Sequence, residues 1–270
     1  MSDPPPLRVW TCGRTVTGPV RRNNEDNLWL AKVGDPEARA GDREASGSSA
    51  FPGVLLAVAD GMGGAKAGEV ASRMAVETLS AELTRRVEGG LATAREWREA
   101  ARGAVVAAHE RIRDDAAGDL TREGMGTTLT VAWILGRCVE VFQVGDSRAY
   151  VHHAGRLRQV TRDQSLVTKL VEDGILTEEE AERIPGRHII LQALGSLEDL
   201  DVVHESVALE DGDVVLLCTD GLSGLVKHAD IESVLKKGGP LADQVDRLVK
   251  LAETAGGTDN ITVVLARAGS

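Results

Sequence analysis

Cysteine is scarce in this chain of 270 residues, and its histidines follow no metal-binding pattern. Cys12, Cys138 and Cys218 are odd in number and far apart, and no C-x-x-C pair occurs, so neither a disulfide framework nor a zinc knuckle is indicated. The six histidines form no H-E-x-x-H motif or comparable ligand pair. A metal site in this protein should therefore use oxygen ligands, which favours Mg²⁺ or Mn²⁺.

Long apolar runs and an excess of positive charge are also missing. No window approaches about 18 consecutive apolar residues, and the first residues, MSDPPPLRVW, lack the basic and apolar regions of a secretory signal. The formal net charge is −11, from 42 acidic and 31 basic residues, which argues against a general affinity for nucleic acid or an anionic membrane. We therefore expect a cytoplasmic protein with no nucleic-acid partner and no membrane insertion.

The chain does contain a series of short apolar runs bounded by glycine and polar residues, a pattern typical of buried strands. They predict strands at residues 27–33, 54–59, 127–135, 138–144, 148–153, 156–160, 202–208, 213–218 and 261–267. Short connections, such as the turn at residues 154–156, predict antiparallel pairing. Thr177 is a plausible cap for a helix in the segment TEEEAER. Further helices are expected over residues 66–88, 93–116 and 240–254.

Several of these runs, including VLLAV and VVLLC, are apolar on both faces, so both faces of the sheets must be covered. Two antiparallel sheets packed face to face, with amphipathic helices on the outer faces, would bury all of them. We therefore predict an α+β fold, a four-layer α-β-β-α sandwich, in one domain over residues 1–270. Residues 1–6 are expected to form a mobile tail and residues 34–50 a surface loop.

Aspartates recur where the apolar runs end or begin. Asp60, Asp146 and Asp220 follow such runs, and Asp259 precedes one. On one rim they would form a cluster of carboxylates, which repel by roughly 4 kcal/mol per pair at about 4 Å and an effective dielectric of about 20. Because that arrangement makes sense mainly around bound cations, it predicts a metal site with oxygen ligands.

Two further motifs carry candidate site residues. The polar cluster RRNNED at residues 21–26 contains Arg21, whose planar fork suits phosphate oxygens, and Glu25 and Asp26, which could hold metal-bound waters. In DGMGG at residues 60–64, Gly61 lets the backbone approach a ligand closely, and its carbonyl could join a cation. Taken alone, each motif is also compatible with an ordinary turn.

Other phosphate chemistries lack their motifs. The glycines near residue 61 match neither G-x-x-x-x-G-K-[ST] nor G-x-G-x-x-G. Gly18, Val144 and Gly224, rather than arginine, stand six residues after the cysteines, which excludes a C-x-x-x-x-x-R phosphatase. The segment DGDVV at residues 211–215 superficially fits an aspartyl-phosphate motif, but it precedes its strand, so a nucleophile there would point the wrong way.

In this order, the motifs resemble those of the metal-dependent serine/threonine protein phosphatases of type 2C, particularly the bacterial members. The matching stretches span residues 21–260 and are RRNNED, DGMGG, GTT (126–128), GDSRAY (145–150), TRDQS (161–165), ALGS (193–196), CTDGL (218–222) and GGTDN (256–260). The family's fold is an antiparallel β-sandwich flanked by helices, which agrees with the layering expected from the apolar runs.

The resemblance implies unequal roles for the aspartates and the glycine. By resemblance, Asp60 bridges two metal ions, Asp220 and Asp259 complete one of them, and the carbonyl of Gly61 serves the other. Asp146 matches a position that, together with the Asp220 position, helps to hold a third and weaker metal in bacterial relatives.

The resemblance also implies a substrate and a reaction. Arg21 matches the arginine that clamps the substrate phosphate, Glu25 and Asp26 match acids that orient metal waters, and residues 165–193 match a flap linked with substrate selection. The implied reaction is hydrolysis of phosphoserine and phosphothreonine in proteins, by direct attack of a hydroxide that bridges two Mn²⁺ or Mg²⁺ ions. The implied partners are phosphorylated proteins, including a serine/threonine kinase.

Two departures from the family pattern concern proton donors. Met62 stands where many eukaryotic relatives carry a histidine, and the D-H-S triplet common in the family is Asp163, Gln164 and Ser165 here. A metal-bound water is then the preferred donor to the leaving alkoxide. His188 lies in the flap and could reach inward, although a lone histidine in such a segment is more often simply exposed.

Alternative functions stay open at the level of sequence. An inactive relative that binds phosphoproteins would be expected to lose metal ligands, whereas all the matched ligands are present. A phosphoesterase acting on small molecules is compatible with the flap and the acidic composition. Incidental turn aspartates would not explain why several motifs occur in the family's order.

Overall fold

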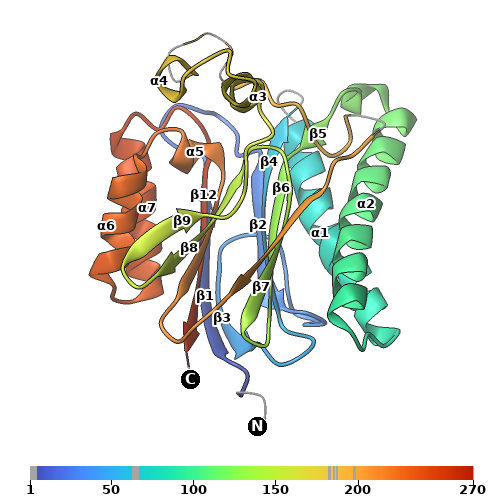
Figure 1. The fold of residues 1–270 in the computed structure, drawn as a ribbon. Helices are drawn as coiled ribbons and strands as arrows, with labels where there is room; N and C mark the ends of the chain where they lie inside the picture. Colours follow the sequence, from blue (N-terminus) through green and yellow to red (C-terminus); the bar gives the residue numbers. More distant parts are fainter. Residues whose placement is uncertain are drawn as a thin grey trace.

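The computed structural model describes residues 5–62, 67–181, 184, 186, 188–196 and 199–269. Two antiparallel sheets of six strands each lie face to face at its centre (Figure 1). The first sheet has the order β3 (Arg43–Ser48), β1 (Arg8–Val16), β12 (Ile261–Gly269), β11 (Val214–Cys218), β8 (Arg148–His153), β9 (Arg156–Gln159). The second has the order β10 (Val203–Ala208), β7 (Cys138–Val144), β6 (Leu129–Leu135), β4 (Val54–Met62), β2 (Asp26–Lys32), with β5 (Gly126–Thr127) paired to β4.

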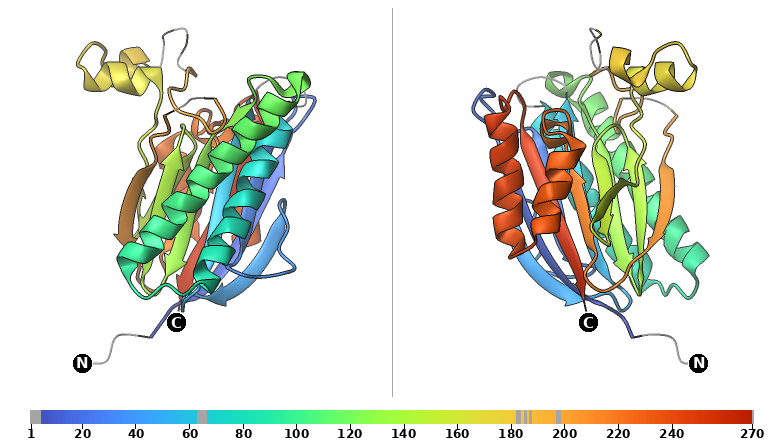
Figure 2. Two further views of the ribbon diagram at one scale, coloured as in Figure 1. Left: turned by 90° about the vertical axis from the view of Figure 1, so that its right-hand side faces the viewer. Right: turned by 60° about the vertical axis from the view of Figure 1, so that its left-hand side comes forward.

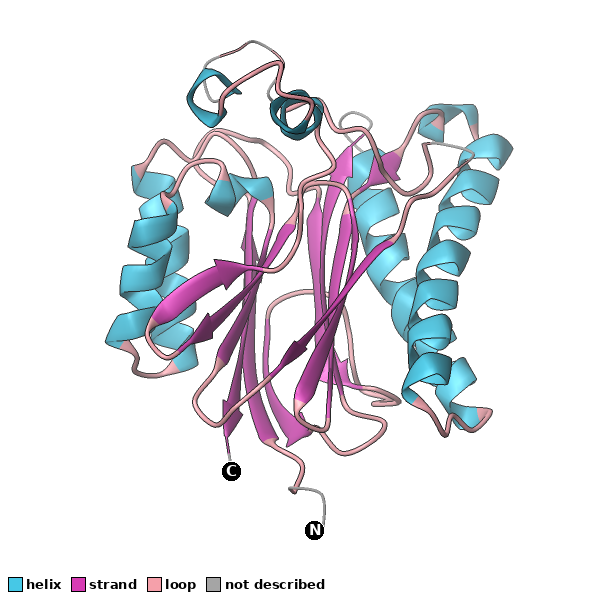
Figure 3. Cartoon of the chain, viewed as in Figure 1, coloured by secondary structure: helices cyan, strands magenta, loops and turns pink. Residues whose placement is uncertain are grey.

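Helices cover the outer face of each sheet, so the predicted four-layer α-β-β-α sandwich is confirmed (Figures 1 and 3). α1 (Ala67–Glu88) and α2 (Ala94–Gly118) cover the second sheet, and α6 (His228–Lys237) and α7 (Leu241–Thr254) cover the first (Figure 2). The short α5 (Asp220–Ser223) follows β11, and the 3-10 helix η1 (Leu120–Arg122) follows α2. Above one end of the sheets lie α3 (Leu166–Glu172) and α4 (Glu178–Ala181). Among the described helices, none has the length and apolar character needed to cross a membrane.

Apolar side chains pack in three layers, which explains why the central strands are buried on both faces. Leu28, Leu56 and Val264 lie fully buried between the two sheets. Leu79 of α1 and Ile112 of α2 are fully buried against the second sheet. Burial of one such side chain stabilises the fold by roughly 1.5–3 kcal/mol relative to leaving it exposed. The strands are thus held from both sides, and their ends are fixed where polar residues emerge.

Two predicted connections are wrong. The surface loop expected over residues 34–50 contains β3, which pairs with β1 from Arg8↔Ser48 to Gly13↔Arg43. As an edge strand with alternating exposed residues, β3 carries the polar composition of a loop. The short connection after residues 138–144 does not make an antiparallel pair with residues 148–153. Instead β7 belongs to the second sheet and β8 to the first, so residues 145–147 cross between the sheets.

The local patterns missed further elements and correctly predicted a turn. β1 and α6 are absent from the sequence-based predictions, although Ile231 and Leu235 of α6 are buried at helical spacing. The turn at residues 154–156 is confirmed, because β8 and β9 pair as far as His153↔Arg156. Its two central residues, Ala154 and Gly155, have φ values of 48° and 79°, as a two-residue hairpin turn requires.

Parts of some predicted segments fall outside the described residues. They are residues 1–4 of the tail, residues 63 and 64 of DGMGG, residue 66 of the helix predicted over 66–88, and residues 182, 183, 185 and 187 of the flap.

Candidate functional site

The predicted site residues come from segments that meet at one end of the sandwich. Asp60 on β4 lies opposite Asp26 on β2 in the strand register. Asp220 begins α5 directly after β11, and Asp259 lies shortly before β12. Asp146 lies in the loop that crosses between the sheets. The sandwich therefore gathers carboxylates that are far apart in the sequence, as the strand-end pattern predicted.

A cleft of about 770 Å³ opens at this end of the molecule. All the predicted site residues except Asp26 line it, namely Arg21, Glu25, Asp60, Gly61, Asp146, Asp220 and Asp259. Met62, Thr128, Asn260, His188 and Ile190 are among the other lining residues. Segments at the strand ends of both sheets, together with the flap, thus contribute to one concave surface.

Three of the clustered carboxyls, those of Asp60, Asp146 and Asp220, have raised pKa values. Burial raises the pKa of Asp60 well above its usual range, and the charges of Asp26, Asp220 and Asp146 raise it further. Burial raises the pKa of Asp146 to about 7, with the charge of Asp220 as the next cause. For Asp220, burial is again the main cause and Asp259 the next. Ionising this cluster is unfavourable without added positive charge, which a divalent cation would supply.

The donor atoms fit a hard divalent cation. Every predicted ligand offers an oxygen atom, which Mg²⁺ and Mn²⁺ prefer. Oδ1 of Asp220 is buried, and no N–H or O–H group in the described part of the chain donates a hydrogen bond to it. As the side chains lie, no three acidic, histidine or cysteine residues of the described ranges close around a single point. A cation held by several of these residues would therefore require some of their side chains to turn, and Asp259 is at present paired with Arg21.

Arg21 lies on the wall of the cleft with about half of its side chain exposed. Its Nη2 donates a hydrogen bond to Oδ2 of Asp259 at 2.6 Å, and its Nε donates to the carbonyl of Thr258 at 3.2 Å. A guanidinium carries five N–H donors, so others remain for a phosphate. The arginine is thus placed beside the carboxylates rather than on a distant turn.

Glu25 is fixed in the cleft through its own backbone. Its carbonyl accepts hydrogen bonds from the N–H of Gly61 at 3.2 Å and from Oγ of Ser72 at 2.5 Å. Burial raises the pKa of its carboxyl, and the charge of Arg21 opposes that rise. The segment before β2 is therefore anchored both to β4 and to α1.

Asn260 organises the same segment, although it was not among the predicted site residues. Its Oδ1 accepts from the N–H of Glu25 at 2.8 Å, and its Nδ2 donates to the carbonyls of Thr17 and Asn23 at 3.0 and 2.9 Å. The TDN motif contained this residue, but only the aspartate was chosen from it. The buried side-chain amide of Asn260 bonds to three backbone groups, and the spacing of residues in the sequence does not reveal this structural role.

Asp26 lies beneath the cleft rather than on its wall, and it joins the two sheets. Its Oδ2 accepts hydrogen bonds from Oγ1 of Thr219 at 2.8 Å and Oγ1 of Thr262 at 2.6 Å. Burial raises its pKa to about 7, and these two hydroxyl groups oppose the rise. Both threonines were missed from sequence, although Thr219 directly precedes Asp220 and Thr262 lies three residues after Asp259.

Thr128 holds the backbone of Asp60. Its N–H donates to the carbonyl of Asp60 at 2.9 Å, and its Oγ1 accepts from the N–H of Asp60 at 2.9 Å. The same hydroxyl shares a hydrogen bond of 2.8 Å with Oγ of Ser147, in the loop that carries Asp146. The GTT motif thus links the segments of two predicted metal ligands.

Gly61 is required by close packing, independently of any ligand role. A Cβ atom at this position would lie 2.2 Å from the carbonyl oxygen of Gly68 and 2.5 Å from that of Glu25. Any side chain would therefore push β4 away from α1 and from the segment before β2. This contact adds a reason for the glycine that the sequence did not supply.

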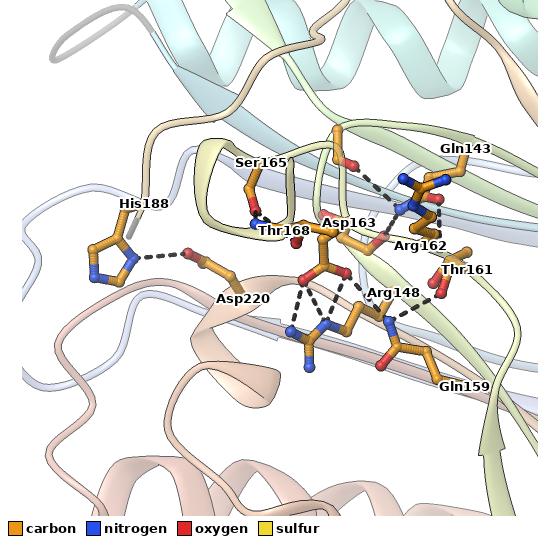
Figure 4. A network of polar contacts seen from close by, with 12 residues as sticks. Gln143, Arg148, Gln159, Thr161, Arg162, Asp163, Ser165, Thr168, His188 and Asp220 are labelled. Carbon is orange, nitrogen blue, oxygen red and sulfur yellow. Dashed lines mark hydrogen bonds and ion pairs between the residues drawn. The ribbon is translucent and has the colours of Figure 1, made fainter. Parts of the chain in front are cut away.

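The flap, residues 165–193, borders the cleft. Ser165 and Ile190 form a β-bridge at its base, and His188 and Ile190 line the cleft. His188 is largely exposed, yet its Nδ1 lies 3.8 Å from Oδ2 of Asp220 (Figure 4). The histidine that sequence alone would leave on the surface therefore also faces the carboxylates.

Comparison with known proteins identifies the family of this chain. Residues 45–266 match the protein phosphatase 2C family. The serine/threonine phosphatase Stp of Listeria welshimeri is 35% identical over 252 residues, which are 93% of each chain. The crystal structure of the Mycobacterium tuberculosis serine/threonine phosphatase PstP/Ppp matches with 35% sequence identity and a TM-score of 0.81, covering 98% of this chain and 100% of that chain.

A second solved structure bears on the metals. It is the catalytic domain of serine/threonine protein phosphatase PstP in complex with two manganese ions, 32% identical with a TM-score of 0.78, covering 98% of this chain and 100% of that chain. The family match covers most of the sequence, and the similarity to the Listeria protein extends over nearly all of it. The chain therefore belongs to the protein phosphatase 2C family.

Proposed function

We propose that this protein is a metal-dependent serine/threonine protein phosphatase that hydrolyses phosphoserine and phosphothreonine in proteins, with Mn²⁺ or Mg²⁺ as its cofactor. The observation that carries the proposal is the cleft in which Asp60, Asp220 and Asp259 lie beside Arg21. Carboxylates for cations and a guanidinium for a phosphate are the two elements that this reaction needs. The names of the relatives support the same activity.

Each residue has a distinct task in the proposed reaction. Asp60, Asp220, Asp259 and the carbonyl of Gly61 would hold two cations, and Asp146 with Asp220 would hold a third. When bound, the divalent cations supply activation of the attacking water and neutralise charge on the phosphoryl group. The remaining N–H groups of Arg21 would orient the phosphate oxygens for in-line attack.

Glu25 and Asp26 would orient water in the cleft, and water would also supply the proton for the leaving group. Glu25, whose pKa is raised by burial, lines the cleft, and Asp26 supports it from below. We assign both to the orientation of water. Met62 lines the cleft but carries no proton to donate, so the leaving alkoxide would take its proton from water held in the cleft.

The test is release of phosphate from a phosphothreonine peptide with Mn²⁺, with Mn²⁺ and excess chelator, and with Asp220→Asn. We expect chelator to abolish activity and Asp220→Asn to lower kcat/KM by at least about 100-fold, since loss of an outer partner alone costs roughly 10–100-fold. Undiminished activity in chelator would contradict the metal-dependent reaction. Turnover of small phosphoesters without turnover of any phosphopeptide would contradict the protein substrate.

Partners, location and domain organisation complete the proposal. We assign phosphorylated proteins, including a serine/threonine kinase, as partners, and a cytoplasmic location. All three cysteines lie among the described residues and are free, which supports that location because disulfides are rare in cytosolic proteins. Residues 1–270 are assigned to one catalytic domain, with residues 165–193 as its flap.

A further inference from the structure

The root of the flap, residues 163–165, ties the flap to several distant pieces of chain (Figure 4). Both oxygens of Asp163 accept hydrogen bonds from Arg148 on β8, with Nη2 at 2.6 Å and Nε at 2.9 Å. Ser165 caps α3 by accepting from the N–H of Thr168 at 3.3 Å. Between these two anchors stands Gln164, at the position where the family commonly has histidine.

Gln164 forms hydrogen bonds with both the N–H and the carbonyl of Gly145. Its side-chain Oε1 accepts a hydrogen bond from the N–H of Gly145 at 2.7 Å. The backbone N–H of Gln164 donates to the carbonyl of Gly145 at 3.0 Å. Gly145 has a φ of 102°, a conformation that other residues rarely adopt, so the loop is held in an unusual shape. The next residue is Asp146, and a shift of Gly145 would move that carboxylate directly.

The same side chain also binds the end of the segment that returns from the flap. Nε2 of Gln164 donates to the carbonyl of Asp201 at 2.9 Å, shortly before β10. One amide therefore joins the loop 145–147, the start of the flap and the chain beyond it. An amide can do this because it offers an acceptor and a donor together, and it keeps both at every pH in the physiological range.

We propose that Gln164 is a positioning residue that holds Gly145, and through it Asp146, at the rim of the cleft. The inference rests on the proposed function, in which Asp146 helps to hold the third cation. Gln164 is not among the residues that line the cleft, so we assign it no contact with the substrate. Its contribution is to fix the backbone on which a ligand stands, and loss of such an outer contact typically weakens a metal site by roughly 10–100-fold.

The experiment compares Gln164→Leu with Gln164→Glu in the full chain. Leucine removes the side-chain acceptor and donor, whereas glutamate keeps an oxygen that accepts from Gly145 but cannot donate to Asp201. Two measurements are made on each protein without substrate: amide exchange at Gly145 by NMR, and Mn²⁺ binding by calorimetry. Gln159→Leu is the matched control, because Gln159 donates to Thr161 and Asp163 within the same network and not to the 145–147 loop.

For Gln164→Leu we expect amide exchange at Gly145 to accelerate about tenfold, the upper range for one lost hydrogen bond. The weakest Mn²⁺ site should lose about tenfold or more in affinity, while the two tighter sites stay unchanged. Gln164→Glu should keep the exchange rate and the Mn²⁺ affinity within about threefold of the wild type, a difference of under 1 kcal/mol. The control should match the wild type in both measurements.

Failure of the inference and failure of the proposed function give different results. If Gln164→Leu leaves exchange at Gly145 or the weakest Mn²⁺ site unchanged while Asp146→Asn removes that site, the positioning role is overturned and the cation role stands. Equal weakening in Gln164→Leu and Gln164→Glu would assign the effect to the bond with Asp201 and would also overturn it. If Asp146→Asn leaves Mn²⁺ binding unchanged, the cation role itself fails, and the inference fails with it.

Discussion

The floor of the cleft and the flap beside it are built in opposite ways. On the floor, Asp26 and Asp60 lie opposite each other on paired strands, and the threonine hydroxyls of both sheets hold them. In the flap, no described residue of α3 is buried, and Ile175 beyond it is 64% exposed. The floor depends on the packed sandwich, whereas the flap depends on the polar contacts at its root.

The two regions meet two different physical requirements of a phosphatase. Holding several carboxylates close together is electrostatically unfavourable, and a core packed on both faces can hold them in place. A surface segment with few buried contacts opens with a small free energy, so it can adapt to different partners. We expect substitutions on the floor to change chemistry, and substitutions at the flap root to change position and local stability.

The strongest way to sharpen the comparison is Asp60→Asn. It removes the predicted bridging ligand, and we expect kcat/KM for a phosphothreonine peptide to fall at least about 1000-fold, because even one lost stabilising donor can cost about 100–1000-fold. The metal-free variant should unfold at a higher temperature than the wild type, since one buried and repelled carboxylate is gone. Steady-state assays with Mn²⁺ and thermal scans with chelator measure the two effects.

The exposed Glu179 of α4 provides the matched control in the flap. Glu179→Gln also removes one negative charge, but from a solvated helix, so activity and melting temperature should stay close to the wild type. A comparable loss of activity in both variants would erase the distinction between floor and flap.

A smaller effect is expected from Arg148→Met at the flap root. It leaves Asp163 without its bidentate partner, and breaking a largely buried pair of this kind costs about 3 kcal/mol. Amide exchange in residues 161–165 should accelerate strongly, while kcat/KM should fall much less than in Asp60→Asn. Arg158→Met, on the exposed side of neighbouring β9, is the control. Unchanged exchange in Arg148→Met would show that the root does not depend on this pair.

The smallest effect concerns pH and the carboxyls in and beneath the metal-free cleft. The pKa values of Asp26 and Asp146 are raised to about 7 by burial, compared with about 4 in an unfolded chain. Between those values the folded state keeps protons that the unfolded state releases, so the free energy of unfolding falls as pH rises. From about pH 5 to about pH 7.5 we expect a loss of at least about 2 kcal/mol in chelator.

Cations should reduce that pH dependence. Bound Mn²⁺ favours the ionised carboxylates, so denaturant titrations with Mn²⁺ should show a flatter profile than those with chelator. A stability that is flat or increasing over this range in chelator would contradict the raised pKa values. Such a result would show that these buried carboxyls affect stability no differently from solvent-exposed acids.

The two regions also differ in how well the sequence predicts them. Runs such as residues 54–59 are apolar on both faces, and this directly requires cover on both sides, which the sandwich provides. The prediction of a loop over residues 34–50 was wrong because β3, an edge strand with alternating exposed residues, has the polar composition of a loop. The predicted pairing across residues 145–147 was wrong because the length of the connection between two strands does not reveal which sheet the second strand joins.

By itself, the sequence determined the types of chemistry available to this protein. Strand-end aspartates, Arg21 and Gly61 follow from local patterns and from the order of the motifs, since these depend on neighbouring residues. Only the tertiary structure decided which groups meet: that Asp26 lies under the cleft between two threonines, that His188 faces Asp220, and that Gln164 grips Gly145. Such contacts join residues from different sheets and loops, and they exist only after the layers have packed, because no local pattern encodes the distance between them.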